Sequence, residues 1–217
     1  MKFHKSSLVL GLVAGLGIAG AALSLGQGEK KEAKSPRESM QEMMKDPAAM
    51  QAAMAKWEET TKTGPMHKGM EKYVGEWTTA SKMFMDPSAP PMESKGSAKF
   101  EIVMGGRYLV QEFKGDMMGM PYEGMGYTGF DNNRKLFVSN WIDSMSTGIM
   151  TMKGSLDDTG KIMTQFGEMD EPMTGEMGKV IRSQTTWIDD NTFKFTMAEV
   201  MYGEPFVVME ITYTKKK

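Results

Sequence analysis

From residue 75 to residue 214 the chain alternates apolar and polar positions in short runs, and turn-forming residues interrupt these runs at near-regular intervals. In one such run, Ala98, Phe100 and Ile102 alternate with Lys99 and Glu101. Strict alternation over several residues is typical of a half-buried β-strand. Gly, Asp, Asn and Pro between the runs are typical of the tight turns that join antiparallel neighbours. The pattern therefore predicts a mainly β domain built from consecutive hairpins.

Ten strands are expected in this block, at residues 76–85, 98–104, 107–114, 122–130, 136–142, 149–156, 161–168, 180–187, 192–200 and 206–214. An antiparallel sheet of this size removes its open edges by closing into a barrel. The interior of a barrel with about eight to ten strands is either filled by side chains or holds one small ligand. We predict a mainly β, about ten-stranded antiparallel up-and-down barrel in which Phe100, Ile102, Phe193 and Phe195 are largely buried.

Residues 1–26 have the features of a secretory signal peptide. Lys2 and Lys5 precede an uncharged stretch rich in Leu, Val, Ala and Gly. Ala19-Gly20-Ala21 provides the small residues of a cleavage site, and we expect the mature chain to begin directly after it. The uncharged stretch is also about long enough to span a bilayer without cleavage. We therefore expect an extracytoplasmic protein, periplasmic or secreted, whose only contact with a membrane would be an uncleaved N-terminal anchor.

Residues 27–65 are expected to form a flexible tether and two short, Met-rich helices. Lys, Glu and Gly dominate the start of this segment, which has too few apolar residues to bury a core. Ser35-Pro36-Arg37-Glu38 provides a capping box with Pro at the first helical position, and Asp46-Pro47 provides a second helix start. Met and Trp at helical spacing predict an amphipathic second helix. The barrel domain is then expected at residues 66–217, after a last helical turn at residues 66–73.

Composition excludes several classes of function. The 217 residues include no cysteine and two histidines, His4 and His67. The lack of cysteine excludes disulfides, thiolate metal sites and a cysteine nucleophile. The formal net charge is −2 and most basic residues are scattered, so nucleic acid is not an expected partner. Haem would need an axial ligand, and the C-terminal strands contain no histidine. We expect no cofactor, and no feature indicates a particular oligomeric state.

One mixture of aromatic and polar residues is a candidate ligand site at one end of the barrel. Trp141 and Asp143 share a strand face, and a polar turn begins at Ser144. A ligand pocket combines an apolar wall with a few polar groups. The residues expected to bind the ligand are Trp77, Arg107, Glu112, Trp141, Asp143 and Ser144. A purely structural role also fits, in which Asp143 and Ser144 cap a turn and Trp141 fills the barrel.

Methionine, with 26 residues, is more frequent than glycine, with 24. Its ordinary role is to fill irregular gaps in apolar packing. However, Met117-Met118-Gly119-Met120 lies in an expected loop, and Met145, Met150 and Met152 lie in one expected hairpin. Thioethers in such groups can bind Cu(I) or be oxidised reversibly. A soft-metal or oxidant-scavenging protein is therefore one alternative, and an enzyme with its site at the barrel mouth is another.

Several segments together carry a family resemblance: Gly75-Glu76-Trp77, Met85-Asp86-Pro87, Ala89-Pro90-Pro91, Gly105-Gly106-Arg107, residues 118–124, residues 129–132, residues 141–148 and residues 209–213. Through these segments the chain resembles an uncharacterised, largely bacterial family catalogued as domain of unknown function 1579. The resemblance extends from His67 to the C-terminus. It implies a lipocalin-like or calycin-like barrel but brings no activity with it. The barrel pattern and the candidate ligand residues favour a binding protein for a small apolar or amphipathic molecule.

Overall fold

The computed structural model describes residues 34–200 and 205–217. The predicted signal peptide and most of the predicted tether lie outside these residues. The contacts divide the chain into two compact units, one ending at Met50 and the other beginning at Gln51, within the second helix. No helix in the described part of the chain is long and apolar enough to cross a membrane.

Three α-helices and one 3₁₀ helix precede the strands: α1 (Pro36–Met43), α2 (Pro47–Thr61), α3 (Pro65–Lys68) and η1 (Gly69–Tyr73). The predicted capping box is confirmed at the start of α1. The Ser35 hydroxyl accepts a hydrogen bond from the backbone N–H of Glu38, and the Glu38 carboxylate accepts one from the backbone N–H of Ser35. Both bonds satisfy backbone donors that the first helical turn leaves without partners.

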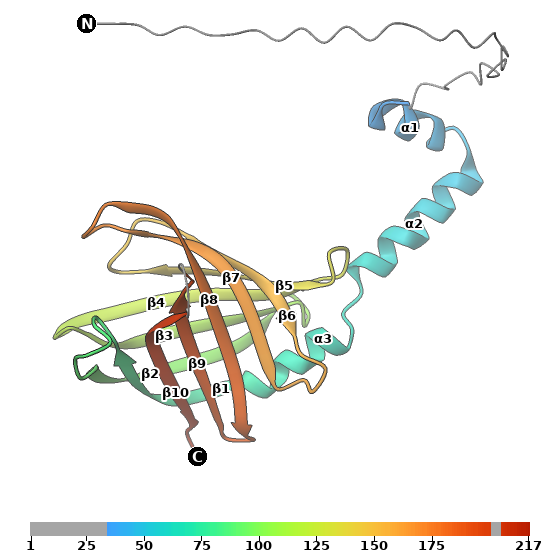
Figure 1. Ribbon diagram of the computed structural model, residues 1–217. Helices are drawn as coiled ribbons and strands as arrows, with labels where there is room; N and C mark the ends of the chain where they lie inside the picture. The colour runs from blue at the N-terminus through green and yellow to red at the C-terminus, as the bar shows by residue number, and fades with distance from the viewer. Residues whose placement is uncertain (1–33, 201–204) are drawn as a thin grey trace, which may run out of the picture. The chain divides into compact units, whose positions relative to one another are not determined.

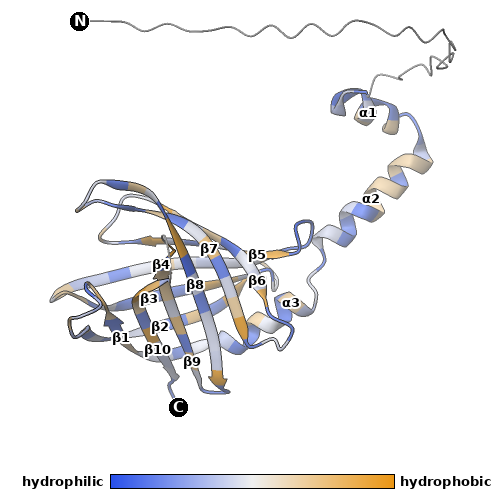
Figure 2. Ribbon diagram, viewed as in Figure 1, coloured by the Kyte–Doolittle hydropathy of each residue, from blue (hydrophilic) through white to orange (hydrophobic). Residues whose placement is uncertain are grey.

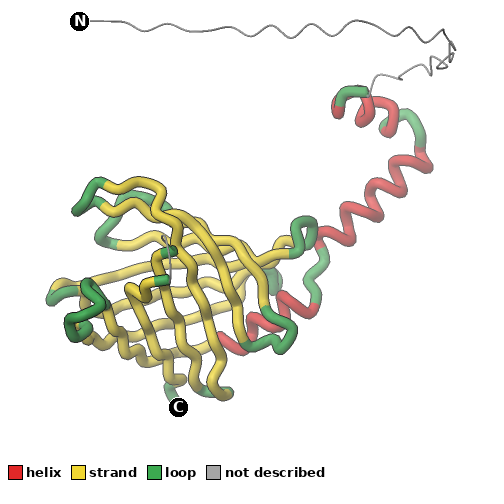
Figure 3. The backbone as a smooth tube through the Cα atoms, viewed as in Figure 1, coloured by secondary structure: helices red, strands yellow, loops and turns green. Residues whose placement is uncertain are grey.

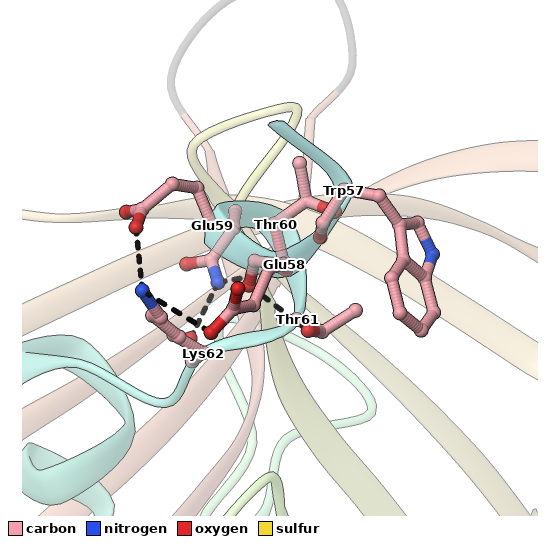
Figure 4. Close-up of polar contacts among 7 residues, drawn as sticks. Trp57, Glu58, Glu59, Thr60, Thr61 and Lys62 are labelled. Atoms are coloured by element: carbon pink, nitrogen blue, oxygen red, sulfur yellow. Dashed lines mark hydrogen bonds and ion pairs between the residues drawn. The ribbon is translucent and has the colours of Figure 1, made fainter. Parts of the chain in front are cut away.

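Helix α2 has no buried residue, although its sequence predicts an apolar stripe. Figure 4 shows Lys62 just beyond the end of this helix, where its ammonium pairs with the carboxylates of Glu58 and Glu59. The ring of Trp57 projects away from these ion pairs and is 61% exposed. The helical spacing therefore correctly predicts the helix, but none of its apolar side chains is buried among the described residues.

Ten strands follow: β1 (Gly75–Met83), β2 (Met92–Val103), β3 (Tyr108–Met117), β4 (Met120–Asp131), β5 (Leu136–Asp143), β6 (Met150–Leu156), β7 (Ile162–Glu171), β8 (Glu176–Asp189), β9 (Thr192–Glu199) and β10 (Phe206–Lys215). Each strand pairs antiparallel with the next, and β1 pairs with β10 to close the barrel. Figures 1 and 3 show the strands wrapping around one interior, with short turns at both ends. The predicted ten-stranded up-and-down barrel is confirmed.

Inward and outward positions alternate along each strand, as the hydropathy bands in Figure 2 indicate. On β8, for example, Ile181, Ser183 and Thr185 are buried while the residues between them are more exposed. Phe100 and Phe193 are buried as predicted. Ile102 and Phe195 are only half-buried. For Phe195 the reason is that its side chain lines a cavity rather than a filled core.

An aromatic floor, consisting of Tyr73, Trp77, Phe100, Trp187, Phe193 and Tyr213, closes the barrel end next to η1. The indole N–H of Trp77 donates to the carbonyl oxygen of Tyr73 at 2.8 Å, and the indole N–H of Trp187 donates to the Tyr73 hydroxyl at 2.9 Å. Burial raises the pKa of Tyr73 to about 12, partly opposed by the Trp187 hydrogen bond. Edge-to-face aromatic contacts fix these rings against one another.

Candidate functional site

The barrel is hollow beyond the aromatic floor. A cavity of ≈ 2020 Å³ extends from η1 to the turns at the opposite end, and all ten strands contribute to its lining. We call the end formed by these turns the rim; Met85, Met118 and Met145 lie there. Binding pockets for small molecules usually measure about 300–1,000 Å³. The interior therefore has room for a small ligand together with water.

A polar belt lies on the inner face of the barrel; most of its members lie two residues toward the rim from an apolar core residue, as Ser139 does from Phe137. It consists of Gln111, Thr128, Ser139, Gln165, Ser183 and Thr185, none of which carries a formal charge. The hydroxyls of Thr128 and Ser139 are 2.9 Å apart. The Gln165 side-chain nitrogen donates to the Ser139 hydroxyl oxygen at 3.0 Å. These bonds join side chains from β4, β5 and β7 into one network.

A second hydrogen bond of the belt joins β3 to β10, across the place where β1 and β10 close the barrel. The Gln111 side-chain nitrogen, on β3, donates to the hydroxyl oxygen of Tyr213, on β10, at 3.1 Å. Burial raises the pKa of Tyr213 above its usual range, partly opposed by this hydrogen bond. The phenol therefore stays neutral over the physiological pH range, so the contact adds no charge to the interior.

Gly154 allows Gln165 to reach Ser139. Gly154 lies on β6, between the strands that carry these two residues. A Cβ atom at position 154 would overlap the carbonyl oxygen of Thr164 and would lie 2.6 Å from the Cα of Gln165. Because Gly154 has no side chain, the side chains of Ser139 on β5 and Gln165 on β7 can meet above β6.

Trp141 forms a flat wall of the cavity because two glycines face its ring. A Cβ atom at Gly126 would lie 2.8 Å from the indole, and one at Gly124 would overlap it. The indole N–H donates to the hydroxyl oxygen of Tyr122 at 3.0 Å. Glycine at both positions therefore relieves crowding against the indole ring. This arrangement also holds the ring in one orientation against the cavity.

Asp143 lies at the rim and combines two contacts. Its carboxylate accepts a hydrogen bond from the backbone N–H of Met145 at 2.9 Å, which is the turn-capping role. It also faces the Tyr122 hydroxyl. Burial raises the pKa of Tyr122 to about 12; the Trp141 hydrogen bond opposes this shift, and the Asp143 carboxylate adds to it. Ser144 exchanges hydrogen bonds with the backbone of Glu123, so it extends the strand pairing at the rim.

The structure does not bring the six predicted ligand residues together. Trp141 and Asp143 line the cavity, whereas Trp77 is completely buried in the aromatic floor. Glu112 lies on the outer face, because its neighbour Gln111 points inward and successive strand residues alternate. Arg107 lies in the turn between β2 and β3, at the end of the barrel opposite the rim.

Arg107 instead binds the end of helix α2. Its guanidinium donates to the carbonyl oxygen of Thr61 at 2.9 Å. The Asn132 side-chain amide donates to the carbonyl oxygens of Thr60 at 3.0 Å and Lys62 at 2.7 Å. The last carbonyls of a helix have no partner within the helix. Arg107 and Asn132 therefore cap α2 from the barrel, a role that Arg107 was not expected to have.

The polar belt was not predicted, although its signal is present in the sequence. Gln111 and Ser139 have apolar residues two positions away on both sides, and Gln165 has Met163 on one side. A polar residue at an inward position of an amphipathic strand is unusual, because the cost of burying a polar group requires a hydrogen-bonding partner. Searching the inward face for such exceptions would have identified these residues.

On the strands, inward-facing charges lie at the rim, whereas Lys72 of η1 lines the opposite end of the cavity, with its ammonium over the Trp187 ring. Lys179 and Glu199 line the cavity there, and the Lys179 ammonium lies 3.0 Å from a Glu199 carboxylate oxygen and 3.3 Å from one of Glu176. Within residues 34–200 and 205–217, no group of three or more His, Asp or Glu side chains is placed to hold a metal ion. The polar belt between these two ends contains no charged residue.

Methionines occupy both the rim and one wall of the cavity. Those at the rim with exposed side chains are Met85, Met92, Met118, Met120, Met145, Met173 and Met177. A methionine wall packs around Ile181 on the inner face; it consists of Met150, Met152, Met169, Met197 and Met209. Flexible thioether side chains adapt to ligands of different shape. The opening and one side of the cavity can therefore adjust to an occupant.

Comparison with known proteins identifies a family, and one solved structure supports the barrel fold. The crystal structure of Rv2717c from M. tuberculosis matches with a TM-score of 0.52 and 13% identity, over 72% of this chain and 100% of that chain. A redesigned β-barrel matches with a TM-score of 0.39 and 14% identity, over 71% of this chain and 100% of that one. No curated protein matches the sequence. The model of the family described as "Protein of unknown function (DUF1579)" matches residues 62–215, and the chain therefore belongs to this family.

Proposed function

We propose that the protein is an extracytoplasmic binding protein that takes up a small apolar or amphipathic molecule in its barrel. The observation that supports this function is the cavity of ≈ 2020 Å³ above the aromatic floor. Protein interiors are normally close-packed, with few voids larger than a water molecule. A cavity of this size indicates an interior suited to an occupant. The extracytoplasmic location follows from the leader pattern at residues 1–26.

The lining supports an apolar or amphipathic ligand. Trp141 provides a fixed aromatic surface, and Phe195 and the methionine wall provide adaptable apolar ones. The polar belt adds a small number of hydrogen-bonding groups. This combination of apolar wall and few polar groups is typical of small-molecule sites.

Trp141→Ala is expected to weaken binding of the neutral, solvent-sensitive dye Nile red by about tenfold or more. A large apolar side chain contributes about 1.5–3 kcal/mol when its surface is buried, and each 1.4 kcal/mol changes a dissociation constant about tenfold. The measurement is a titration followed by dye fluorescence, with a thermal melt to show that the variant unfolds cooperatively. Trp57→Ala is the matched control, because Trp57 is exposed on α2 and does not line the cavity.

Two results would contradict this assignment. The first is the absence of Nile red binding by the native protein, since a hollow apolar barrel should accept a neutral aromatic dye. The second is loss of dye binding in Trp57→Ala while Trp141→Ala binds like the native protein, which would place the dye on α2 rather than in the barrel.

A second candidate function, binding of a soft cation such as Cu(I), is supported by the methionine wall. Five thioethers from four strands pack together there, and thioethers are ligands that Cu(I) prefers. Titration with Ag(I), a redox-stable soft cation, should raise the melting temperature of the native protein. The rise should be lost in Met197→Leu/Met209→Leu, which removes two sulfurs from directly paired positions of β9 and β10. An unchanged melting temperature of the native protein would exclude this candidate.

A further inference from the structure

Two hydroxyls of the polar belt face the cavity without a partner. The side chains of Ser183 and Thr185 are on the inner face of β8 and are only 3% and 8% exposed. Both residues line the cavity. In the part of the chain that the structure describes, neither hydroxyl makes a hydrogen bond to protein, whereas Thr128, Ser139 and Gln165 bond to one another. Thr79 Oγ1 is the one sealed side-chain polar atom without a partner among the described residues, so the Ser183 and Thr185 oxygens are open to the cavity. Their hydrogen-bonding partner must therefore enter the cavity, as water or as a polar group of a ligand that displaces it.

The neighbouring strand adds an amide to the same place. Gln165 on β7 lies directly opposite Ser183 in the register, and Met163 lies opposite Thr185. The amide of Gln165 already bonds to Ser139, and it can donate two hydrogen atoms. Two hydroxyls and one amide edge thus converge on one side of the cavity. Such a set suits a hydroxyl or carbonyl group, which can accept from the amide and exchange bonds with the hydroxyls.

The charge distribution limits the ligand further. Among the inward positions of the described strands, charged residues occur only near the rim: Asp143, Glu171, Lys179 and Glu199. Lys179 is already paired with Glu199 and Glu176. An ionised group held at the belt would lose its water without meeting an opposite charge among the belt residues. The Lys72 ammonium lies beyond the belt, where it bonds to the carbonyl oxygen of Gly160 and lies over the Trp187 ring. The belt can therefore satisfy an uncharged polar group but not a charged one.

We propose that the ligand is uncharged in the part that lies beyond the rim and that it places a hydroxyl or carbonyl group against Ser183 and Thr185. This proposal rests on the proposed binding function and specifies its ligand class. The apolar body of the ligand packs between Trp141 and the methionine wall. Any charged group that the ligand carries stays at the rim, in contact with water.

The test uses three compact molecules that share one ring system: naphthalenemethanol, methylnaphthalene and naphthoate. Each competes with Nile red for the native protein at neutral pH, where only naphthoate is charged. We expect the alcohol to displace the dye at the lowest concentration. Naphthoate should need a concentration at least about tenfold higher. Their similar size separates the effect of charge from that of shape.

Thr185→Val provides the matched variant, because it removes the hydroxyl and conserves the side-chain shape. It should weaken binding of naphthalenemethanol about threefold to tenfold, as expected for one neutral hydrogen bond, and leave methylnaphthalene unchanged. Ser183→Ala should act in the same direction. Thr186→Val is the control, since this threonine is the next residue on β8 and faces outward. It should leave the affinities for all three molecules unchanged.

The outcomes separate the two proposals. If neither Nile red nor any naphthalene compound binds, the binding function itself is wrong. If the dye binds but naphthoate competes as well as the alcohol, the function stands and the uncharged ligand class is wrong. If Thr185→Val and Ser183→Ala weaken the binding of the alcohol and of methylnaphthalene equally, the hydroxyls of Ser183 and Thr185 serve packing rather than recognition. The assignment of the polar contact is then overturned.

Discussion

Replacing Trp77 with alanine is expected to lower the free energy of unfolding by about 3–5 kcal/mol, the usual cost of deleting a buried aromatic side chain. Trp77 is completely buried in the aromatic floor. Its ring contacts Phe193 and Trp187 edge-to-face, at centroid distances of 4.8 and 6.1 Å. Its indole N–H also holds the carbonyl of Tyr73, so the variant removes an anchor of η1 as well as packing.

Urea unfolding followed by circular dichroism measures this effect. Trp57→Ala removes the same side chain from an exposed position and should change the free energy of unfolding by less than about 0.5 kcal/mol. A loss below about 1 kcal/mol in Trp77→Ala would show that the floor does not hold the barrel together. The comparison matters for function because Trp77 was expected to contact a ligand, whereas its position in the structure assigns it to stability.

Gly154→Ala is expected to be the most disruptive single-methyl substitution in the barrel and to impair both stability and binding. The added Cβ would overlap the backbone of Thr164 on β7, and backbone cannot move aside as a flexible side chain can. Overpacking typically costs about 1–3 kcal/mol. Separation of β6 from β7 would also break the contact between Ser139 and Gln165, so Nile red should bind more weakly to the folded variant.

Gly69→Ala is the matched control for this substitution. Gly69 has helical backbone angles, and no atom lies within 4 Å of the Cβ that alanine would add. Its replacement should be neutral or should stabilise the protein by about 0.4–1 kcal/mol, because alanine restricts the unfolded chain. Melting temperatures and dye affinities that are the same for both variants would contradict the close approach of β6 and β7.

The strands were predictable because their signal is local. Alternation along one run of residues identifies a strand whatever it pairs with, and turn residues mark where it ends. The errors lie at the ends. We expected the second strand at residues 98–104, yet β2 begins at Met92, where it pairs with Met83 of β1. Pairing with a neighbour extends a strand beyond its own pattern, so the boundary is not encoded in that segment alone.

The candidate site was predictable only in part. Trp141 and Asp143 could be assigned to one face because they are two residues apart on a strand. Glu112 and Arg107 do not belong to the cavity, and two further facts were needed to see this. One is which face of β3 points inward, and the other is which end of the barrel is open. Both are set by closure of the sheet. A pattern within one strand cannot distinguish them, because either face can become the interior.

The sequence by itself determined the strands, the turns, the capped start of α1 and the membership of a family. Each depends on backbone propensity, side-chain periodicity or short motifs, which act over a few residues. Only the tertiary structure decided that the barrel is hollow and that an uncharged polar belt lies within it. The cavity is the difference between the space that ten paired strands enclose and the summed volume of their inward side chains. The belt depends on contacts such as that between Gln111 and Tyr213, which are 102 positions apart in the chain and meet only when the barrel closes.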